Sequence, residues 1–305
     1  MRIAIMGATS QIAKDLIESF AAKNSHALLL YARRTQAVQE WLAHVNLADR
    51  YAVHDFEAFG THEHLDAIMN FVGVGNPAQA AVMGASVFDV TLKYDNMALD
   101  YVRQHPTCRY IFLSSGAAYG TSFDAPVDAN TQAAVPINNL QPQDWYGVTK
   151  LHAECRHRAL THLPIVDIRL FNYFSQTQNM DARFLMTDIV RAIRDKTVLK
   201  TSTDYMVRDY IDPSDFSSLV NAILVAPMVN TVVDVYSKAP VDKPTLLAAM
   251  QENFGLRYEF TQVDKGINAT GSKPHYYSLN RASNFNYEPT MTSLESLINE
   301  TRKFY

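Results

Sequence analysis

The sequence predicts an α/β protein in which helices cover both faces of a parallel sheet. Short apolar runs typical of buried strands alternate along the chain with helical patterns, an order that favours parallel strands joined by crossover helices. The first apolar run ends in a tight turn at Gly7, and a helical pattern through Ile17 and Phe20 follows it. At 305 residues, the chain is long enough to form one large core and a smaller lobe.

Seven apolar runs are the predicted strands of this sheet. They span residues 2–6, 27–32, 50–54, 66–72, 109–114, 164–170 and 231–236. Gly7 permits the turn after the first strand, and the next helix begins near Ser10 with free backbone N–H groups that suit a pyrophosphate. Ser10 and Ala13 stand where a nucleotide-binding loop usually carries glycines, but both are small enough for close packing. We therefore expect a Rossmann-type, doubly wound sheet.

The end of the second strand bears on the choice of cofactor. A site for NAD usually has a carboxylate there for the ribose 2′-hydroxyl, whereas a site for NADP has an arginine. Ala32 occupies the expected acidic position, and Arg33 and Arg34 follow it. The pattern favours NADP(H), with NAD(H) as the alternative, although arginines of this kind also solvate ordinary loops.

Tyr146 and Lys150 are the strongest candidates for chemistry. They lie four residues apart in a predicted helix from about Trp145 to Leu160, so both face the same side. A nearby ammonium lowers the pKa of a phenol and makes it a usable acid or base closer to neutral pH. Ser115 ends the strand before this helix and can hydrogen-bond the same substrate oxygen. The trio suits proton transfer at a carbinol oxygen during hydride transfer, although Tyr-x-x-x-Lys is also common on ordinary helices.

Two long polar segments, 120–144 and 172–204, interrupt the alternation of strands and helices. Irregular segments of this length in a compact α/β protein are usually binding elements or small insertions. We predict two interleaved lobes. Residues 1–171 with 205–237 form an NAD(P)-binding Rossmann domain, and residues 172–204 with 238–305 form a smaller C-terminal substrate-binding lobe.

Charge and composition narrow the partners and the compartment. The formal net charge of −4 provides no basic footprint for nucleic acid. No run of about 18 apolar residues indicates a membrane span, and the N-terminus has the pattern of a strand rather than a signal peptide. Two cysteines, Cys108 and Cys155, make no disulfide framework and favour a cytoplasmic protein. Cys155 lies three residues from His152, but no further ligand cluster supports a metal site.

Eight motifs follow one another along almost the whole chain. They are Met6-Gly7-Ala8-Thr9, Asp55-Phe56, Asn70-Phe71-Val72-Gly73, Ser114-Ser115-Gly116-Ala117-Ala118-Tyr119-Gly120, Tyr146-Gly147-Val148-Thr149-Lys150, Arg169-Leu170-Phe171-Asn172, Arg208-Asp209-Tyr210-Ile211-Asp212-Pro213-Ser214-Asp215 and Asn286-Tyr287-Glu288-Pro289. In identity and order they resemble the extended short-chain dehydrogenase/reductases of the NAD(P)-dependent epimerase/dehydratase type. Members of this type mostly act on nucleotide-linked sugars.

The resemblance implies a set of cofactor-binding residues at the strand ends and on the catalytic helix. With the arginines named above, the set is Gly7, Thr9, Ser10, Gln11, Ile12, Arg33, Arg34, Asp55, Phe56, Phe71, Val72, Gly73, Tyr146, Lys150 and Phe171. Asp55 and Phe56 are expected to flank the adenine, and residues 71–73 to line the ribose. Phe171 is expected near the nicotinamide, whose ribose Lys150 also holds.

The resemblance also implies substrate contacts. Besides the serine of the trio, Asn172 is expected to contact the substrate, and Arg208 to pair with the diphosphate of a nucleotide sugar. The alternative for Arg208 is a surface arginine paired with Asp209 or Asp212. A second diphosphate arginine has no clear counterpart, and Lys273 is the candidate for its position.

The residues around the serine bear on the reaction. Sugar 4,6-dehydratases of this family carry an Asp-Glu pair after the catalytic hydroxyl, whereas Gly116 and Ala117 stand here, which disfavours a dehydratase. Thr91 replaces the asparagine usual in the preceding helix, and with the NADP preference it favours an NADPH-dependent 4-ketoreductase. A nucleotide-sugar 4-epimerase, which must keep its cofactor bound, is the first alternative. A non-catalytic NADP-binding sensor module is the alternative of another class.

Relatives of this type commonly pair through two helices, which correspond here to residues of about 88–104 and 146–160. Four apolar residues in or beside the first of these helices, Val87, Leu92, Leu99 and Val102, can instead face the sheet. We expect a two-fold homodimer, because this is the commonest closed symmetry of soluble proteins.

Overall fold

A seven-stranded sheet forms the centre of the protein. The computed structural model describes residues 1–61, 64–74, 77–261 and 273–305. The strands are β1 (Arg2–Met6), β2 (Ala27–Tyr31), β3 (Ala52–His54), β4 (Ala67–Asn70), β5 (Arg109–Ser115), β6 (Ile165–Leu170) and β11 (Thr231–Asp234). Their order is β11-β6-β5-β4-β1-β2-β3, and every neighbouring pair runs parallel. This is the order of a Rossmann-type doubly wound sheet, so the predicted fold class is confirmed.

All seven predicted strands are present, and several are shorter than their apolar runs. The run 66–72, for example, continues past the end of β4. It stops pairing at Asn70, because the side-chain oxygen of Asn70 accepts a hydrogen bond from the Val72 N–H at 2.9 Å. Gly73 then takes a φ of +151°. The apolar residues after Asn70 therefore belong to a loop at the carboxyl edge of the sheet.

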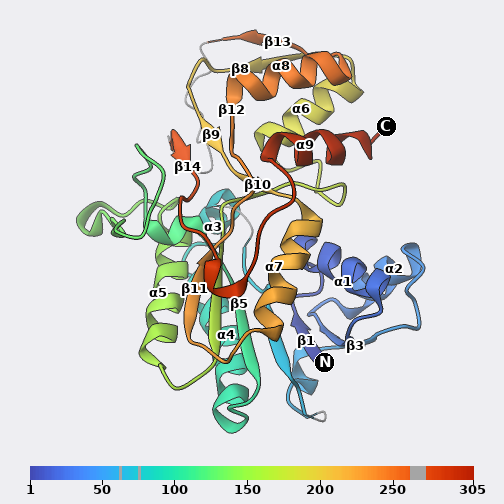
Figure 1. The fold of residues 1–305 in the computed structure, drawn as a ribbon, viewed down its shortest axis with the longest axis vertical. Coiled ribbons are helices and arrows are strands. Elements are labelled where there is room, and N and C mark those ends of the chain that lie inside the picture. The colour runs from blue at the N-terminus through green and yellow to red at the C-terminus, as the bar shows by residue number, and fades with distance from the viewer. Residues whose placement is uncertain (62–63, 75–76, 262–272) are drawn as a thin grey trace.

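Helices cover both faces of the sheet (Figure 1). The helices α1 (Gln11–Lys23), α2 (Thr35–His44) and α7 (Pro213–Val225) share one buried apolar cluster with the sheet. The helices α4 (Ser86–Gln104) and α5 (Trp145–Ala159) share a second cluster, and the short α3 (Pro77–Met83) precedes α4. Ile3 and Ile5 of β1 belong to the first cluster, and Ala4 and Met6 to the second. The alternation follows from the two-residue period of a strand that is buried on both faces.

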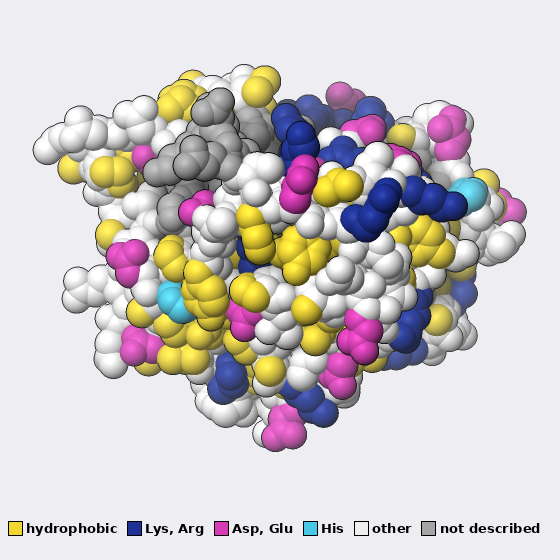
Figure 2. Space-filling model, turned by 90° about the horizontal axis from the view of Figure 1, so that it is seen from above, with side chains coloured by type: hydrophobic (Ala, Val, Ile, Leu, Met, Phe, Trp, Pro, Cys, Tyr) yellow, Lys and Arg dark blue, Asp and Glu magenta, His cyan; other side chains and the backbone are white. Residues whose placement is uncertain are grey.

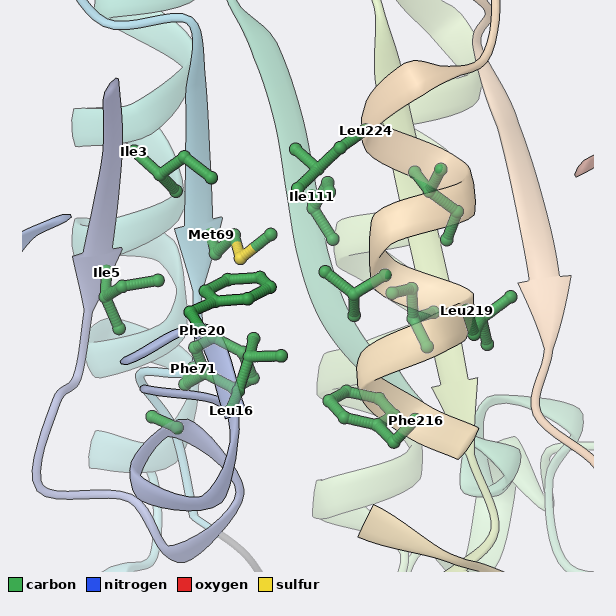
Figure 3. Packing of buried hydrophobic residues seen from close by; sticks show 14 of the residues in the cluster. Ile3, Ile5, Leu16, Phe20, Met69, Phe71, Ile111, Phe216, Leu219 and Leu224 are labelled. Atoms are coloured by element: carbon green, nitrogen blue, oxygen red, sulfur yellow. The ribbon is translucent and has the colours of Figure 1, made fainter. Parts of the chain in front are cut away.

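The first cluster joins α1 and α7 across the sheet surface (Figure 3). In that view Phe20 of α1 lies beside Met69 of β4, and Leu224 of α7 lies beside Ile111 of β5. All four side chains are buried, which removes their apolar area from water. This packing fixes α1 and α7 on the same face of the sheet.

A smaller lobe lies above the sheet (Figure 1). It contains α6 (Leu185–Arg194), α8 (Lys243–Phe254) and α9 (Ser293–Arg302), and β8 (Val198–Thr201) pairs in parallel with β13 (Arg257–Phe260). The expectation that 172–204 is irregular was wrong, because this segment contains α6 and β8. Met186, Ile189 and Val190 give α6 a buried apolar face against α8 and α9. Residues 262–272 of the predicted lobe lie outside the described part of the chain.

Short strand pairs connect the lobe to the sheet. The strand β9 (Val207–Arg208) lies between β12 (Val241–Asp242) and β14 (His275–Tyr276), and β10 (Tyr210–Ile211) pairs with β7 (Asn172–Tyr173). These pairs bring the segment after β6 next to residues from the last third of the chain. The segment 120–144 has little regular structure, with one short 3-10 turn at Ile137–Asn139.

The view from above shows a mixed surface (Figure 2). Lys and Arg side chains gather over one half of this face, with acidic and hydrophobic side chains between them. Within the described ranges, none of the helices is both long and apolar enough to cross a membrane.

Candidate active site

The turn between β1 and α1 has the geometry of a nucleotide-binding loop. Gly7 has a φ of +85°, and a Cβ there would lie 2.9 Å from the Val72 nitrogen, so only glycine fits. Ser10 has extended backbone angles that any residue adopts, and Ala13 is fully buried in the packing of α1. The two positions without glycine therefore need none. The first turn of α1 has no acidic residue, which leaves its positive N-terminal end open to an anion.

The residues predicted to hold the cofactor follow the carboxyl ends of neighbouring strands. The first turn, with Thr9, Gln11 and Ile12, comes after β1, Arg33 and Arg34 come after β2, and Asp55–Phe56 come after β3. Both arginines are exposed. The Asp55 carboxylate caps the 3-10 turn that follows it by accepting the backbone N–H groups of residues 57 and 58. Gln11 donates a hydrogen bond to Ser175 at 2.9 Å, which ties the loop to the segment after β6.

Lys14 was not among the predicted residues, yet it lies close enough to Arg34 for their charges to interact. Burial and then the charge of Arg34 lower the pKa of its ammonium, and its Nζ lies 5.3 Å from the centre of the Trp41 ring. The sequence signal was a cation one position after Ala13. This lysine indicates a role only once the fold places α1 beside the end of β2.

The structure brings Ser115, Tyr146 and Lys150 together. Ser115 ends β5, and the other two project from the first turns of α5. Burial raises the pKa of the Tyr146 phenol, and its hydrogen bond with Ser115 acts in the opposite direction. Lys150 Nζ donates to the Leu113 carbonyl at 2.7 Å and lies 5.9 Å from the centre of the Tyr146 ring. Burial lowers the pKa of Lys150 to about 8.

Two glycines permit this arrangement. A Cβ on Gly147 would lie 2.6 Å from the Ala117 carbonyl oxygen, so the start of α5 packs directly on the turn after Ser115. A Cβ on Gly116 would overlap the ring of Phe171, which stands at the end of β6. Sequence reasoning noted Gly116 only as the absence of an acid. In the structure it lets Phe171 reach the site.

Asn172 and Arg208, the two residues predicted to contact the substrate, lie on β7 and β9. The Asn172 amide donates to the backbone carbonyl oxygens of Asp209 at 3.1 Å and Tyr276 at 3.4 Å. Arg208 donates to the carbonyl oxygens of Val207 at 2.8 Å and Lys273 at 2.6 Å. Burial lowers the pKa of its guanidinium.

The structure does not support the alternative that Arg208 is a surface residue paired with Asp209 or Asp212. Asp209 accepts hydrogen bonds from the Ser237 N–H and the Ser293 hydroxyl, and Asp212 caps α7 through the Ser214 N–H. Arg208 forms no ion pair with either carboxylate within the described residues. Its guanidinium is half-buried and remains available to an anion.

Lys273 lies next to Arg208 and completes a cationic pair. Its Nζ lies 4.8 Å from the centre of the Tyr276 ring and 4.9 Å from that of Phe123. Burial, followed by the charge of Arg208, lowers the pKa of Lys273 to about 8. The half-buried Arg208 and the buried Lys273 repel each other, so a bound anion would stabilise both.

Tyr276 is the residue at this site that the sequence did not indicate. Its hydroxyl oxygen lies 3.3 Å from Ser115 Oγ, although 161 positions separate the two residues along the chain. Phe123 and Phe171 surround its ring.

Within the described part of the chain, the site shows no sign of a metal centre. In the described ranges, no cluster of three or more His, Cys, Asp or Glu side chains is suited to hold a metal ion.

Comparison with known proteins places the chain in a family. Residues 3–236 match the NAD dependent epimerase/dehydratase family. The chain therefore belongs to this family of extended short-chain dehydrogenase/reductase enzymes, as its motifs predicted. No curated protein sequence matches the chain.

Solved structures share the fold. A dTDP-glucose 4,6-dehydratase from Bacillus anthracis str. Ames, in complex with NAD, is 16% identical with a TM-score of 0.79, over 100% of this chain and 96% of that one. A UDP-glucuronic acid 4-epimerase from Bacillus cereus, in complex with UDP-glucuronic acid and NAD, is 16% identical with a TM-score of 0.77, over 100% of both chains. A UDP-glucose 4-epimerase from Bifidobacterium longum, in complex with NAD+ and UDP, is 16% identical with a TM-score of 0.78, over 99% of this chain and 98% of that one.

Proposed function

We propose that the protein is an NADPH-dependent 4-ketoreductase that acts on a nucleotide-linked sugar. The observation that carries the proposal is the joint presence of two groups at the carboxyl edge of the sheet. One is the trio of Ser115, Tyr146 and Lys150, which can move a proton at a carbinol or carbonyl oxygen. The other is the pair of the half-buried Arg208 and the buried Lys273, which suits a diphosphate.

The residues of the chain have separate tasks in this reaction. NADPH, when held by the residues named above, would supply the hydride for the carbonyl carbon. Tyr146 donates its proton to the carbonyl oxygen, and Ser115 donates a hydrogen bond to the same oxygen. The Lys150 ammonium stabilises the phenolate that remains, and a proton from solvent restores the phenol. Asn172 and Phe171 position the sugar and the nicotinamide at the ends of β6 and β7.

Two features support the binding of a dinucleotide: the turn between β1 and α1, and the residues after β2. Gly7 lets the turn approach the loop after β4, and α1 offers its N-terminal N–H groups without a competing acid. Lys14, Arg33 and Arg34 supply positive charge where the 2′-phosphate of NADP would lie, whereas NAD would find no carboxylate there. The NADP preference is therefore part of the proposal. The NAD bound in the solved relatives belongs to those proteins.

A nucleotide-sugar 4-epimerase uses the same trio and is the second candidate. Its reaction would differ in that the sugar is oxidised and then reduced again without release of the cofactor. The third candidate is a sensor module that binds NADP without turnover, and the assembled trio argues against it. Dehydratase chemistry lacks support, because Gly116 and Ala117 follow the serine.

We also propose that the two lobes are divided at residues 171–172, 204–205 and 237–238, and that the protein is cytoplasmic.

We propose a two-fold homodimer as well. The helices α4 and α5 pack side by side and offer a joint surface for it. Val87, Leu99 and Val102 are buried inside the protein, whereas Leu92 is 38% exposed. Of these four residues, Leu92 alone is exposed enough to contact a second subunit. A monomeric mass by light scattering at micromolar concentration would count against the dimer.

The experiment that tests the function follows the oxidation of NADPH with a panel of UDP- and dTDP-linked 4-keto-sugars. Steady oxidation, with release of NADP+ and a reduced sugar, supports the reductase. Interconversion of UDP-glucose and UDP-galactose without net change of the cofactor supports the epimerase. Tight NADPH binding with no reaction on any sugar of the panel supports the sensor.

A further inference from the structure

A second phenol lies at the catalytic serine. The Tyr276 hydroxyl oxygen is 3.3 Å from Ser115 Oγ, in a position that is 6% exposed. Tyr146 hydrogen-bonds Ser115 as well, and the charges of the two phenols influence each other. Ser115 therefore has a tyrosine hydroxyl on each side, and only Tyr146 has a task in the reaction described above.

The Tyr276 side chain is held firmly in this position. Its strand β14 pairs with β9, and the Asn172 amide donates to its carbonyl oxygen at 3.4 Å. Its ring centre lies 4.7 Å from that of Phe123 and 5.1 Å from that of Phe171. Two aromatic rings thus hold the Tyr276 ring while β9 and Asn172 hold its backbone, so the hydroxyl has a defined position relative to Ser115.

The hydrogen bond between Tyr276 and Ser115 decides where the single hydroxyl proton of Ser115 points. A serine hydroxyl has one proton to donate and two lone pairs that accept. The Ala117 N–H already donates to Ser115 Oγ at 3.2 Å. If Tyr276 donates as well, both lone pairs are engaged, and the serine proton is left for Tyr146 or the substrate oxygen. If Ser115 instead donates to Tyr276, it has no proton for the substrate.

The surroundings of Tyr276 favour the first direction. Burial raises the pKa of its phenol, and the hydrogen bond from Ser115 only partly opposes this. The group therefore remains a neutral O–H at working pH, and a neutral phenol is a better donor than an aliphatic hydroxyl because it is the stronger acid.

We infer that Tyr276 is a positioning residue that acts through Ser115. It donates its proton to Ser115 Oγ and so directs the single Ser115 proton to the reacting oxygen of the substrate. The part of this inference that concerns the substrate rests on the proposed function. The direction of the hydrogen bond does not, because it is a property of the protein alone.

Tyr276→Phe tests the inference, because it removes the hydroxyl and keeps the ring. With a sugar that the parent reduces, we expect kcat to fall roughly five- to tenfold with little change in KM, the loss that follows from one misdirected hydrogen bond. In a Ser115→Ala background, the same change should alter kcat by less than about twofold, because the residue through which it acts is gone. Effects that multiply in the double variant would overturn the inference.

A titration without substrate gives an independent answer. Carbon NMR of ζ-13C-labelled tyrosine reports the ionisation of Tyr146, assigned by its loss in Tyr146→Phe. In Tyr276→Phe, the apparent pKa of Tyr146 should rise, because Ser115 loses the donor that fixes the direction of its proton and so donates to the phenolate less effectively. A fall or no change would overturn the inference, since a Ser115 proton released from Tyr276 would stabilise the phenolate.

Tyr277→Phe is the matched control, since it removes a phenol from the next position of the chain and should change neither kcat nor the titration. The same thermal midpoint in both single variants shows that the fold is kept. If the parent reacts with no sugar of the panel, the proposed function fails. The titration then still decides the role of Tyr276.

Discussion

His157 Nδ1 lies 2.6 Å from Asp167 Oδ1, in a position with no solvent exposure. The other ring nitrogen lies 2.7 Å from a carboxylate oxygen of Asp95, so one buried imidazole joins α5 to α4 and β6. Burial alone would lower the pKa of His157, but the hydrogen bonds to Asp167 and Asp95 raise it from 6.5 to about 9. A charged histidine between two carboxylates thus anchors the helix that carries Tyr146 and Lys150.

The first prediction concerns stability and pH. The folded pKa of His157 is above its unfolded value, so its stabilisation is complete below about pH 6.5 and is lost as the pH rises through about 9. The loss should be on the order of 3 kcal/mol, at about 1.4 kcal/mol per pKa unit. Urea unfolding of the parent and of His157→Asn at several pH values measures it, as the difference between the two.

His152→Asn is the control for this measurement, because His152 is an exposed residue of the same helix. The difference in unfolding free energy between parent and His152→Asn should stay constant across the same pH range. An equally constant difference for His157→Asn would show that folding does not raise the pKa of His157.

A second prediction concerns the acid. Tyr146→Phe removes the proton that the proposed reaction delivers to the carbonyl oxygen, so turnover should fall by roughly 10²–10⁴-fold. Binding of NADPH, followed by its fluorescence, should change little, because the ring of residue 146 remains. Near-normal turnover in this variant would remove Tyr146 from the mechanism.

A third prediction concerns the packing of α5. Gly147→Ala places a Cβ 2.6 Å from the Ala117 carbonyl oxygen, so the helix must shift away from the turn after Ser115. We expect a loss of stability of about 1–3 kcal/mol, typical of overpacking, together with a loss of turnover larger than the fraction unfolded explains. Cys155→Ala, at an exposed position of α5, should leave both unchanged. Equal activity of the two folded variants would show that the close approach is unnecessary.

The sheet was predictable because its strands are short, mainly apolar runs, and such runs are typical of strands buried on both faces of a parallel sheet. The helix α6 was missed for a local reason. Its apolar positions, Met186, Ile189 and Val190, are spaced for one helical face, but the polar residues on either side masked this short pattern.

The candidate site was predictable only where its residues share a motif. Ser115, Tyr146 and Lys150 follow from the spacing and from the family pattern. Tyr276 does not, because its contact with Ser115 depends on the pairing of β14 with β9. The choice between partners for Arg208 was equally open in the sequence, since two aspartates lie close by and only the fold assigns them to other groups.

A fourth prediction concerns the cofactor. NADPH should bind more tightly than NADH, and replacing Arg33 and Arg34 together by alanine should remove the preference by weakening NADPH binding alone. Lys14→Ala should reduce the preference partly, because Lys14 lies beside Arg34. Isothermal titration calorimetry measures both affinities. Arg103→Ala, an exposed arginine on α4, is the control. Equal affinity of the parent for both cofactors would refute the assignment of these cations.

The last prediction concerns Arg208. A diphosphate presents several acceptor oxygens, and a guanidinium can donate two parallel hydrogen bonds to it. Lysine keeps the charge but loses this fork, so Arg208→Lys should weaken binding of the nucleotide sugar. The diphosphate does not react, so its interaction is the same in the ground state and the transition state. We therefore expect KM to rise roughly 10- to 100-fold with kcat nearly intact, the sign of lost uniform binding.

Two further measurements define what this result means. Arg302→Lys, at an exposed arginine of α9, should leave KM unchanged and controls for the substitution itself. Binding of UDP and dTDP to Arg208→Lys, measured by calorimetry, should weaken by a factor similar to the rise in KM, because these ligands contain the diphosphate and lack the sugar. If the variant binds both nucleotides as tightly as the parent, the half-buried charge of Arg208 serves the packing of β9 and β14, and the diphosphate lies elsewhere.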